Sequence, residues 1–83
     1  EDGKMRKEIV MPKIGLDMEE GIICEWKKAV GDKIVEGDVI CEIETDKAVT
    51  NVEAAVSGTL VEIVAEEGES VEITKTIAWV EAD

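Results

Sequence analysis

The chain has 83 residues, of which 21 are acidic and 9 basic, so its net charge is −12, and it contains no histidine. A surface this acidic repels nucleic acid and anionic membranes, and we expect neither as a partner. The length allows one small domain without a deep cleft, and histidine, the commonest general base, is missing, so we do not expect a self-contained enzyme.

Short apolar runs separated by turn residues predict an all-β domain. Residues 1–7 are assigned to an N-terminal tail, native or left by cloning, and the domain to residues 8–83. The expected strands cover residues 8–11, 21–27, 33–35, 39–44, 48–53, 59–65, a short stretch around Val71, and 76–80. Pro12 ends the first strand, because proline cannot donate to a strand ladder. No window shows a helical period with capping residues.

The two halves of the chain resemble each other at an offset of 37 residues. Gly21 falls on Gly58 and Gly31 on Gly68, and glycine marks positions that need an unusual backbone conformation. Two similar β units predict a pseudo-two-fold arrangement of two sheets. Such a two-fold places the junction between the units at one end of the domain and the chain termini at the other.

The junction between the units is the stretch from Glu42 to Thr50. It predicts two strands joined by a tight turn with Lys47 at its tip. Asp46 is expected to close the turn by bonding to its own backbone. Lys47 is the one lysine that combines a hairpin tip with the symmetry junction.

At this stretch the chain resembles the lipoyl domains of the dihydrolipoyl acyltransferase components of 2-oxo acid dehydrogenase complexes. The marker of that family is an acidic residue followed by Thr-Asp-Lys-Ala, which is residues 44–48 in this chain. Further similar segments are Met11-Pro12-Lys13 with Gly15, Glu20-Gly21, Val30-Gly31-Asp32, Glu36-Gly37-Asp38 and Val56-Ser57-Gly58.

The resemblance implies a flattened β-barrel or sandwich of two four-stranded antiparallel sheets, with pseudo-two-fold symmetry and lipoic acid in amide linkage to Lys47. In the family the lipoyl-lysine is a swinging arm. It accepts an acyl group from a thiamin-dependent 2-oxo acid decarboxylase, passes it to an acyltransferase for coenzyme A, and is reoxidised by dihydrolipoyl dehydrogenase. A lipoate-protein ligase attaches the cofactor. The domain itself would be a non-catalytic, monomeric carrier, in the cytoplasm of a prokaryote or the mitochondrial matrix of a eukaryote.

Two groups of residues are candidates for recognition in this resemblance. Asp46 and Ala48 flank the lysine, and the ligase and the decarboxylase would read them; the alternative is that Asp46 serves only the turn and Ala48 only gives clearance. Glu44 resembles the family's acidic residue before the motif, and its alternative is a plain charge on the face of the strand. In the family the loop after the first strand lies near the lysine hairpin and helps the decarboxylase to choose its carrier. The candidate residues of this loop are Leu16, Asp17, Met18, Glu19 and Glu20. For Leu16 and Met18 the alternative is that they pack into the core and hold the loop down.

Other interpretations remain open at this point. Biotinyl carrier domains share the fold but resemble one another in having methionines on both sides of the lysine, whereas Asp46 and Ala48 stand there in this chain. An unmodified acidic module that binds a basic partner is a third hypothesis. We expect Cys24 and Cys41 to be buried thiols in neither a disulfide nor a metal site.

The two tryptophans are the chain's only aromatic residues. Trp26 aligns with Ile63 in the repeat and is expected in the core. Trp79 aligns with Glu42, so we expect it to be the more exposed of the two.

Overall fold

The computed structural model describes residues 5–82, and the first four residues of the expected tail lie outside this range. Eight strands fill most of it. In chain order they are β1 (Met5–Val10), β2 (Glu20–Trp26), β3 (Lys33–Ile34), β4 (Val39–Glu44), β5 (Val49–Glu53), β6 (Gly58–Ile63), β7 (Ser70–Glu72) and β8 (Thr76–Ala82). None of the described residues belongs to a helix that could cross a membrane.

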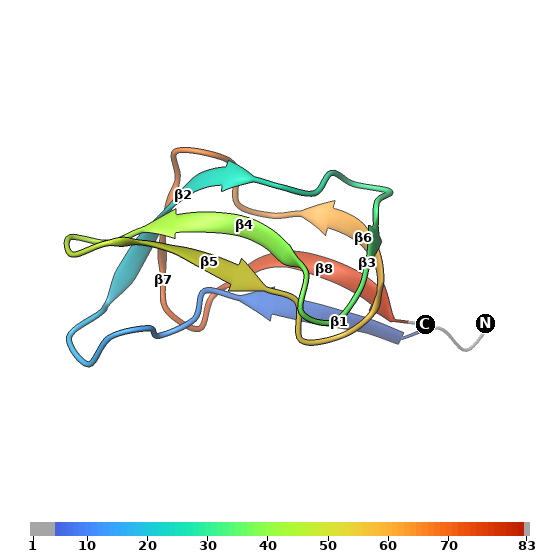
Figure 1. The fold of residues 1–83 in the computed structure, drawn as a ribbon, viewed down its shortest axis with the longest axis horizontal. Helices are drawn as coiled ribbons and strands as arrows, with labels where there is room; N and C mark the ends of the chain where they lie inside the picture. Colours follow the sequence, from blue (N-terminus) through green and yellow to red (C-terminus); the bar gives the residue numbers. More distant parts are fainter. Residues whose placement is uncertain (1–4, 83) are drawn as a thin grey trace.

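The strands form two four-stranded antiparallel sheets (Figure 1). One sheet has the order β1-β8-β6-β3, and the other has the order β5-β4-β2-β7. Each sheet therefore combines strands from both halves of the chain. The all-β architecture with two four-stranded sheets is confirmed.

The internal repeat is visible in individual hydrogen bonds. The N–H of Gly31 donates to the carbonyl of Leu60 at 2.7 Å, and the N–H of Gly68 donates to the carbonyl of Ile23 at the same distance. The two donor residues are 37 positions apart in the sequence, and so are the two acceptor residues. The two glycines have positive φ angles of 99° and 91°, which explains why the same residue type recurs there. The predicted pseudo-two-fold is thus confirmed.

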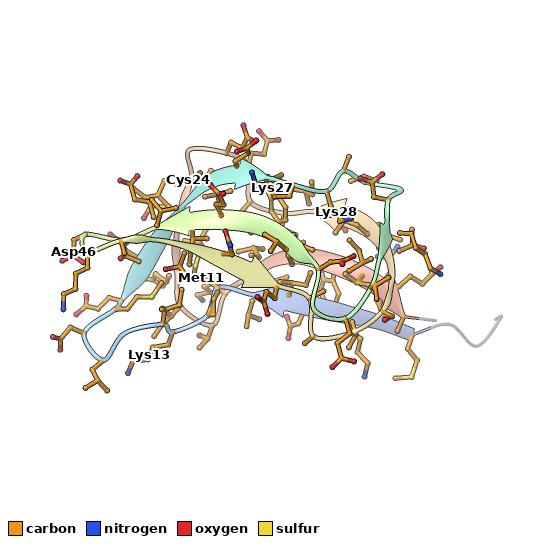
Figure 2. All side chains as sticks on the ribbon, viewed as in Figure 1. Met11, Lys13, Cys24, Lys27, Lys28 and Asp46 are labelled. Carbon is orange, nitrogen blue, oxygen red and sulfur yellow. The ribbon has the colours of Figure 1, made fainter. Side chains whose placement is uncertain are left out.

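The core lies between the sheets and consists of apolar side chains supplied in equivalent pairs by the two halves. Ile23 matches Leu60, and Ile43 matches Val80, and all four are fully buried. Met11 comes from the first connection and is buried between the sheets (Figure 2). Burial of one such side chain contributes about 1.5–3 kcal/mol. This shared core therefore stabilises both halves as one unit.

The first strand begins earlier than expected. Met5 pairs with Ala82 and Lys7 with Val80 across β1 and β8, so residues 5–7 belong to the sheet rather than to a tail. Their exposed side chains carry no apolar pattern, and the strand is specified by its backbone pairing with β8.

The tryptophans and one cysteine also differ in detail from the expectations. Trp26 packs against the core but is only half-buried, as is Trp79. Cys24 is half-buried rather than buried, because it follows the buried Ile23 and the alternation of the strand places it on the outer face of β2. The pairing of β2 with β4 shifts register between Ile23 and Glu25, and this bulge allows Trp26 to pack against the core.

The β4–β5 turn lies at the end of the molecule opposite the start of β1 and the end of β8 (Figure 1). The repeat explains this placement. Met5 pairs with Ala82 at one end of the domain, and the equivalent contact under the pseudo-two-fold, between Thr45 and Ala48, closes the turn at the other end. A group attached at the turn would project away from both ends of the described chain.

Candidate functional site

The turn between β4 and β5 is closed by the side chain of Thr45. The backbone N–H of Thr45 donates to the carbonyl of Ala48 at 3.0 Å. The Thr45 hydroxyl accepts hydrogen bonds from the N–H groups of Lys47, at 3.2 Å, and Ala48, at 3.3 Å. The expectation that Asp46 closes the turn was therefore wrong. Asp46 is exposed at the tip instead (Figure 2).

Lys47 extends from this turn into solvent. Its side chain is 73% exposed, and its Nζ lies 3.9 Å from the Oδ2 of Asp17, which is itself 89% exposed. An ion pair this open contributes about 0–1 kcal/mol. The amine is thus accessible to another enzyme and only weakly held by its own domain.

The neighbour of the turn is the connection between β1 and β2. The strand pairing makes Val10, before the connection, equivalent to Glu53 in the second half, which is 43 residues further along the chain. After the connection, Gly21 is equivalent to Gly58, which is only 37 residues further along. The connection is therefore six residues longer than its counterpart in the second half. The repeat thus departs from symmetry beside Lys47.

The longer connection contacts the turn. Together they enclose a hollow of about 120 Å³, to which the connection contributes Ile14, Gly15, Asp17 and Met18, and the hairpin contributes residues 45–48 and Thr50. The expectation that the loop after the first strand lies near the lysine turn is confirmed. Ile14 and Thr50 were not among the expected site residues, since neither belongs to a recognisable motif.

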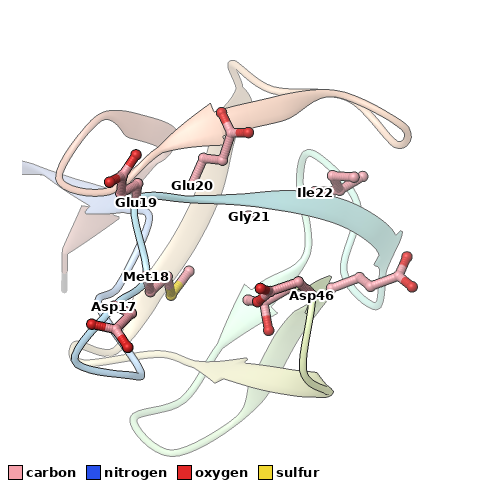
Figure 3. Close-up of a pocket in the computed structure, with 9 residues that line it drawn as sticks. Asp17, Met18, Glu19, Glu20, Gly21, Ile22 and Asp46 are labelled. Atoms are coloured by element: carbon pink, nitrogen blue, oxygen red, sulfur yellow. The ribbon is translucent and has the colours of Figure 1, made fainter.

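An acidic hollow of about 520 Å³ adjoins the same turn (Figure 3). The connection and β2 contribute residues 17–22 to it, and the hairpin contributes residues 44–46. Five of these side chains are carboxylates, namely Asp17, Glu19, Glu20, Glu44 and Asp46. The structure therefore brings together the two groups of acidic residues that the sequence analysis singled out separately.

Leu16 and Met18 have different positions, although they are two residues apart. Leu16 is 93% exposed at the tip of the connection, so it does not pack into the core. Met18 packs against the core, and its Sδ accepts a hydrogen bond from the N–H of Ile14 at 3.3 Å. A Cβ atom at Gly21 would lie 3.2 Å from the Met18 methyl. Met18 thus anchors the connection, and Leu16 is presented to solvent.

The two cysteines are free thiols and form no disulfide. Burial raises the pKa of Cys41 to about 12, with a smaller contribution from Cys24 nearby. Desolvation and the carboxylates of Glu44 and Glu42 also raise the pKa of Cys24. Both thiols therefore stay protonated at neutral pH, and neither is an activated nucleophile. Within residues 5–82 no group of three or more potential ligands is arranged to hold a metal ion.

Thr45 and Ile22 are site residues that the sequence analysis missed. Thr45 lies inside the quoted motif, and hydroxyl side chains commonly accept backbone hydrogen bonds in turns, so this role could have been inferred. Ile22 lines the acidic hollow with 41% of its surface exposed. It lies in the expected strand, but the sequence did not reveal that its side chain faces the hairpin end.

The sequence of residues 7–80 matches the profile of a family described as "Biotin-requiring enzyme". Among solved structures, the fold is similar to the lipoyl domain of the 2-oxoglutarate dehydrogenase complex from Azotobacter vinelandii. That match has a TM-score of 0.72 and 30% identity, and covers 92% of this chain and 98% of the other. The urea carboxylase of Kluyveromyces lactis also matches, with a TM-score of 0.77 and 25% identity over 96% of this chain but 6% of its own.

Two relatives are subunits of pyruvate dehydrogenase complexes. One is the mitochondrial dihydrolipoyllysine-residue acetyltransferase component 2 of Arabidopsis thaliana, which is 44% identical over 87% of this chain and 14% of its own length. The other is the E1 component subunit beta of Rhizobium meliloti, which is 47% identical over 89% of this chain and 16% of its own. The chain thus spans less than a fifth of the length of either protein. It belongs to the biotin/lipoyl attachment family, and its relatives include subunits of pyruvate dehydrogenase and the lipoyl domain of a 2-oxoglutarate dehydrogenase complex.

Proposed function

We propose that Lys47 carries a lipoyl group in amide linkage to its Nζ, and that the domain is the acyl carrier of a 2-oxo acid dehydrogenase complex. The position of Lys47 is the observation that carries this proposal. Its side chain is 73% exposed, it stands on a hydrogen-bonded turn, and this turn points away from both ends of the described chain (Figure 1).

The surroundings of Lys47 suit an acylated lysine. Amide formation removes the positive charge and with it the ion pair to Asp17. Because that pair is open to solvent at 3.9 Å, its loss costs at most about 1 kcal/mol. A buried or doubly paired lysine would resist the same reaction more strongly.

The chain's own contribution is attachment, presentation and recognition. When bound, the lipoyl group supplies a disulfide that takes up an acyl group and two electrons, which is chemistry no side chain of this domain provides. The turn holds the attachment point outward, and covalent tethering raises the effective concentration of the group at each enzyme that it visits.

The acidic hollow and the exposed Leu16, which precedes Asp17 in the same connection, are together the candidate docking surface beside Lys47. We assign it to the thiamin-dependent decarboxylase, for which Asp17, Glu19 and Glu20 supply charge and Leu16 supplies an apolar contact. The flanking residues Asp46 and Ala48 are read by the lipoate-protein ligase. The acyltransferase and dihydrolipoyl dehydrogenase are the further partners, in the cytoplasm of a prokaryote or the mitochondrial matrix of a eukaryote.

A biotinyl carrier is the second candidate. The description of the matching family and the similarity to the urea carboxylase favour it. The residues next to Lys47 favour lipoate instead, because they are Asp46 and Ala48 rather than methionines.

The decisive measurement is the intact mass of the domain after incubation with lipoate, ATP and a lipoate-protein ligase, followed by peptide mapping. We expect one added lipoyl group, located on Lys47 and absent from Lys47→Arg. Lys13 lies on the adjoining connection (Figure 2), so Lys13→Arg is the matched control and should be modified normally. A parallel incubation with biotin, ATP and a biotin ligase tests the second candidate. Modification by biotin alone would overturn the lipoyl assignment.

A further inference from the structure

A second open hollow, of about 720 Å³, lies where the two halves of the chain meet. Trp26, Val30 and Ile63 contribute apolar surface to it, and Glu62, Glu66 and Glu67 contribute carboxylates. Trp26 and Ile63 are equivalent positions in the repeat, so the hollow straddles the pseudo-two-fold. It shares no lining residue with the two hollows beside Lys47.

Hydrogen bonds from the ring and from the backbone of Trp26 hold this residue in place. Its Nε1–H donates to the carbonyl of Ala65 at 2.9 Å, and the backbone N–H of Trp26 donates to Oε2 of Glu67 at 3.0 Å. Val30 beside it is 58% exposed. A fixed aromatic side chain loses little conformational entropy when a ligand binds to it, and such side chains are typical anchors of binding surfaces.

The ion pairs described within residues 5–82 do not involve the carboxylates of this hollow. The described ion pairs of Lys27 join it to Glu25 and Glu42, and that of Lys28 joins it to Asp38. The described ion pairs of Lys27, Lys28 and Lys47 do not involve the carboxylates of Glu62, Glu66 or Glu67. The hollow therefore presents carboxylates around an apolar surface, in a domain whose net charge is −12.

We propose that this hollow binds an arginine-containing segment of a partner protein. The guanidinium lies against the Trp26 indole and pairs with the carboxylates of Glu62 and Glu66, and a neighbouring apolar side chain of the segment covers Val30 and Ile63. Arginine suits this site better than lysine, because its planar group stacks on an aromatic ring and pairs with carboxylates at the same time. The contact does not involve Lys47 and is independent of its modification.

The test is an NMR titration of the ¹⁵N-labelled domain with an amidated peptide of alternating leucine and arginine. We expect saturable shifts of the Trp26 indole N–H and of residues 62–67. The double variant Glu62→Gln/Glu66→Gln should bind about tenfold more weakly, since it removes both paired charges. The matched control Glu36→Gln/Glu53→Gln changes the net charge equally at exposed positions outside the hollow and should bind within about twofold of the parent.

Three results would overturn the proposal. One is equal weakening in both double variants, which would show that the peptide senses only net charge. Another is a set of shifts centred on residues 16–20 and 44–48, which would place the peptide in the acidic hollow beside the lysine turn. The third is equally tight binding of a peptide with lysine in place of arginine. Glu62→Gln/Glu66→Gln should still be lipoylated at Lys47, so this test and that of the carrier function fail separately.

Discussion

Gly37 and Thr74 occupy equivalent positions in the two halves of the chain, and both have positive φ angles, of 95° and 71°. Their hydrogen bonds correspond as well, since the N–H of Gly37 donates to Ala54 at 2.9 Å and that of Thr74 donates to Met11 at 2.8 Å. Glycine adopts this conformation freely, whereas a β-branched residue there is strained by on the order of 1–3 kcal/mol. The fold thus requires the same backbone twice, and only the first half supplies glycine.

Replacement of Thr74 by glycine should raise the free energy of unfolding by about 1 kcal/mol. The relief of strain exceeds the roughly 0.5–1 kcal/mol that glycine costs through the entropy of the unfolded chain. The reciprocal change, Gly37→Thr, should lower it by about 1 kcal/mol, since the same strain and entropy contributions apply with opposite sign. Urea denaturation followed by tryptophan fluorescence measures both. A destabilised Thr74→Gly would show that the position is unstrained.

The sequence predicted the architecture because its main determinants are local and repeated. Gly31 and Gly68 have the special backbone conformation that the repeat indicated, and the apolar residues alternate as expected of strands. The positive φ angle of Thr74 could not be predicted from the sequence, because threonine rarely adopts this conformation. The sequence likewise did not predict that β1 starts at Met5. The side chains at the start of β1 are exposed and show no strand pattern, and its backbone pairing with β8 determines that it is a strand.

The segments that form the candidate site were predicted from the sequence, but the contacts between their side chains were predicted less well. The motif placed Lys47 at a turn, and the resemblance placed the first loop beside it. That Leu16 is exposed while Met18 anchors the loop depends on the space next to Gly21, which no sequence pattern describes. The bulge that brings Trp26 to the core side of β2 is similarly a property of the pairing between two strands.

The different roles of Leu16 and Met18 can be separated by substitution. Leu16 is 93% exposed, so Leu16→Ser should change the free energy of unfolding by no more than about 0.5 kcal/mol. It should lower the rate of reductive acylation by the decarboxylase about tenfold, because it removes an apolar contact. Met18→Ala should instead destabilise the domain by about 1–2 kcal/mol, since Met18 packs against the core. Denaturation and acylation assays with the lipoylated domain measure these effects, and unchanged acylation of Leu16→Ser would contradict the docking surface.

The buried thiol of Cys41 should make the domain less stable at alkaline pH. Its pKa is about 12 in the folded state, compared with an ordinary value of 9.0. Between these values the unfolded chain loses the proton and the folded chain keeps it, so stability present below pH 9 is lost as the pH rises towards 12. The limiting slope for one group is about 1.4 kcal/mol per pH unit.

Cys41→Ala provides the comparison for this pH effect. The variant is expected to be less stable at pH 7 because of the lost packing, but its free energy of unfolding should fall less steeply between pH 9 and 11 than that of the parent. Urea denaturation at several pH values measures both slopes. Parallel curves would mean that Cys41 ionises equally readily in the folded and unfolded states.

The hydroxyl of Thr45 should determine how well the turn presents Lys47. Thr45→Val keeps the shape of the side chain but removes the acceptor used by the N–H groups of Lys47 and Ala48, which costs about 0.5–1.5 kcal/mol. We expect the lipoate-protein ligase to modify this variant about tenfold more slowly, because the loosened turn spends less time in the conformation that the ligase reads. Thr45→Ser keeps the hydroxyl and should be modified at nearly the parental rate, as followed by mass spectrometry over time. Equal rates for the two variants would show that the ligase recognises Lys47 without a preformed turn.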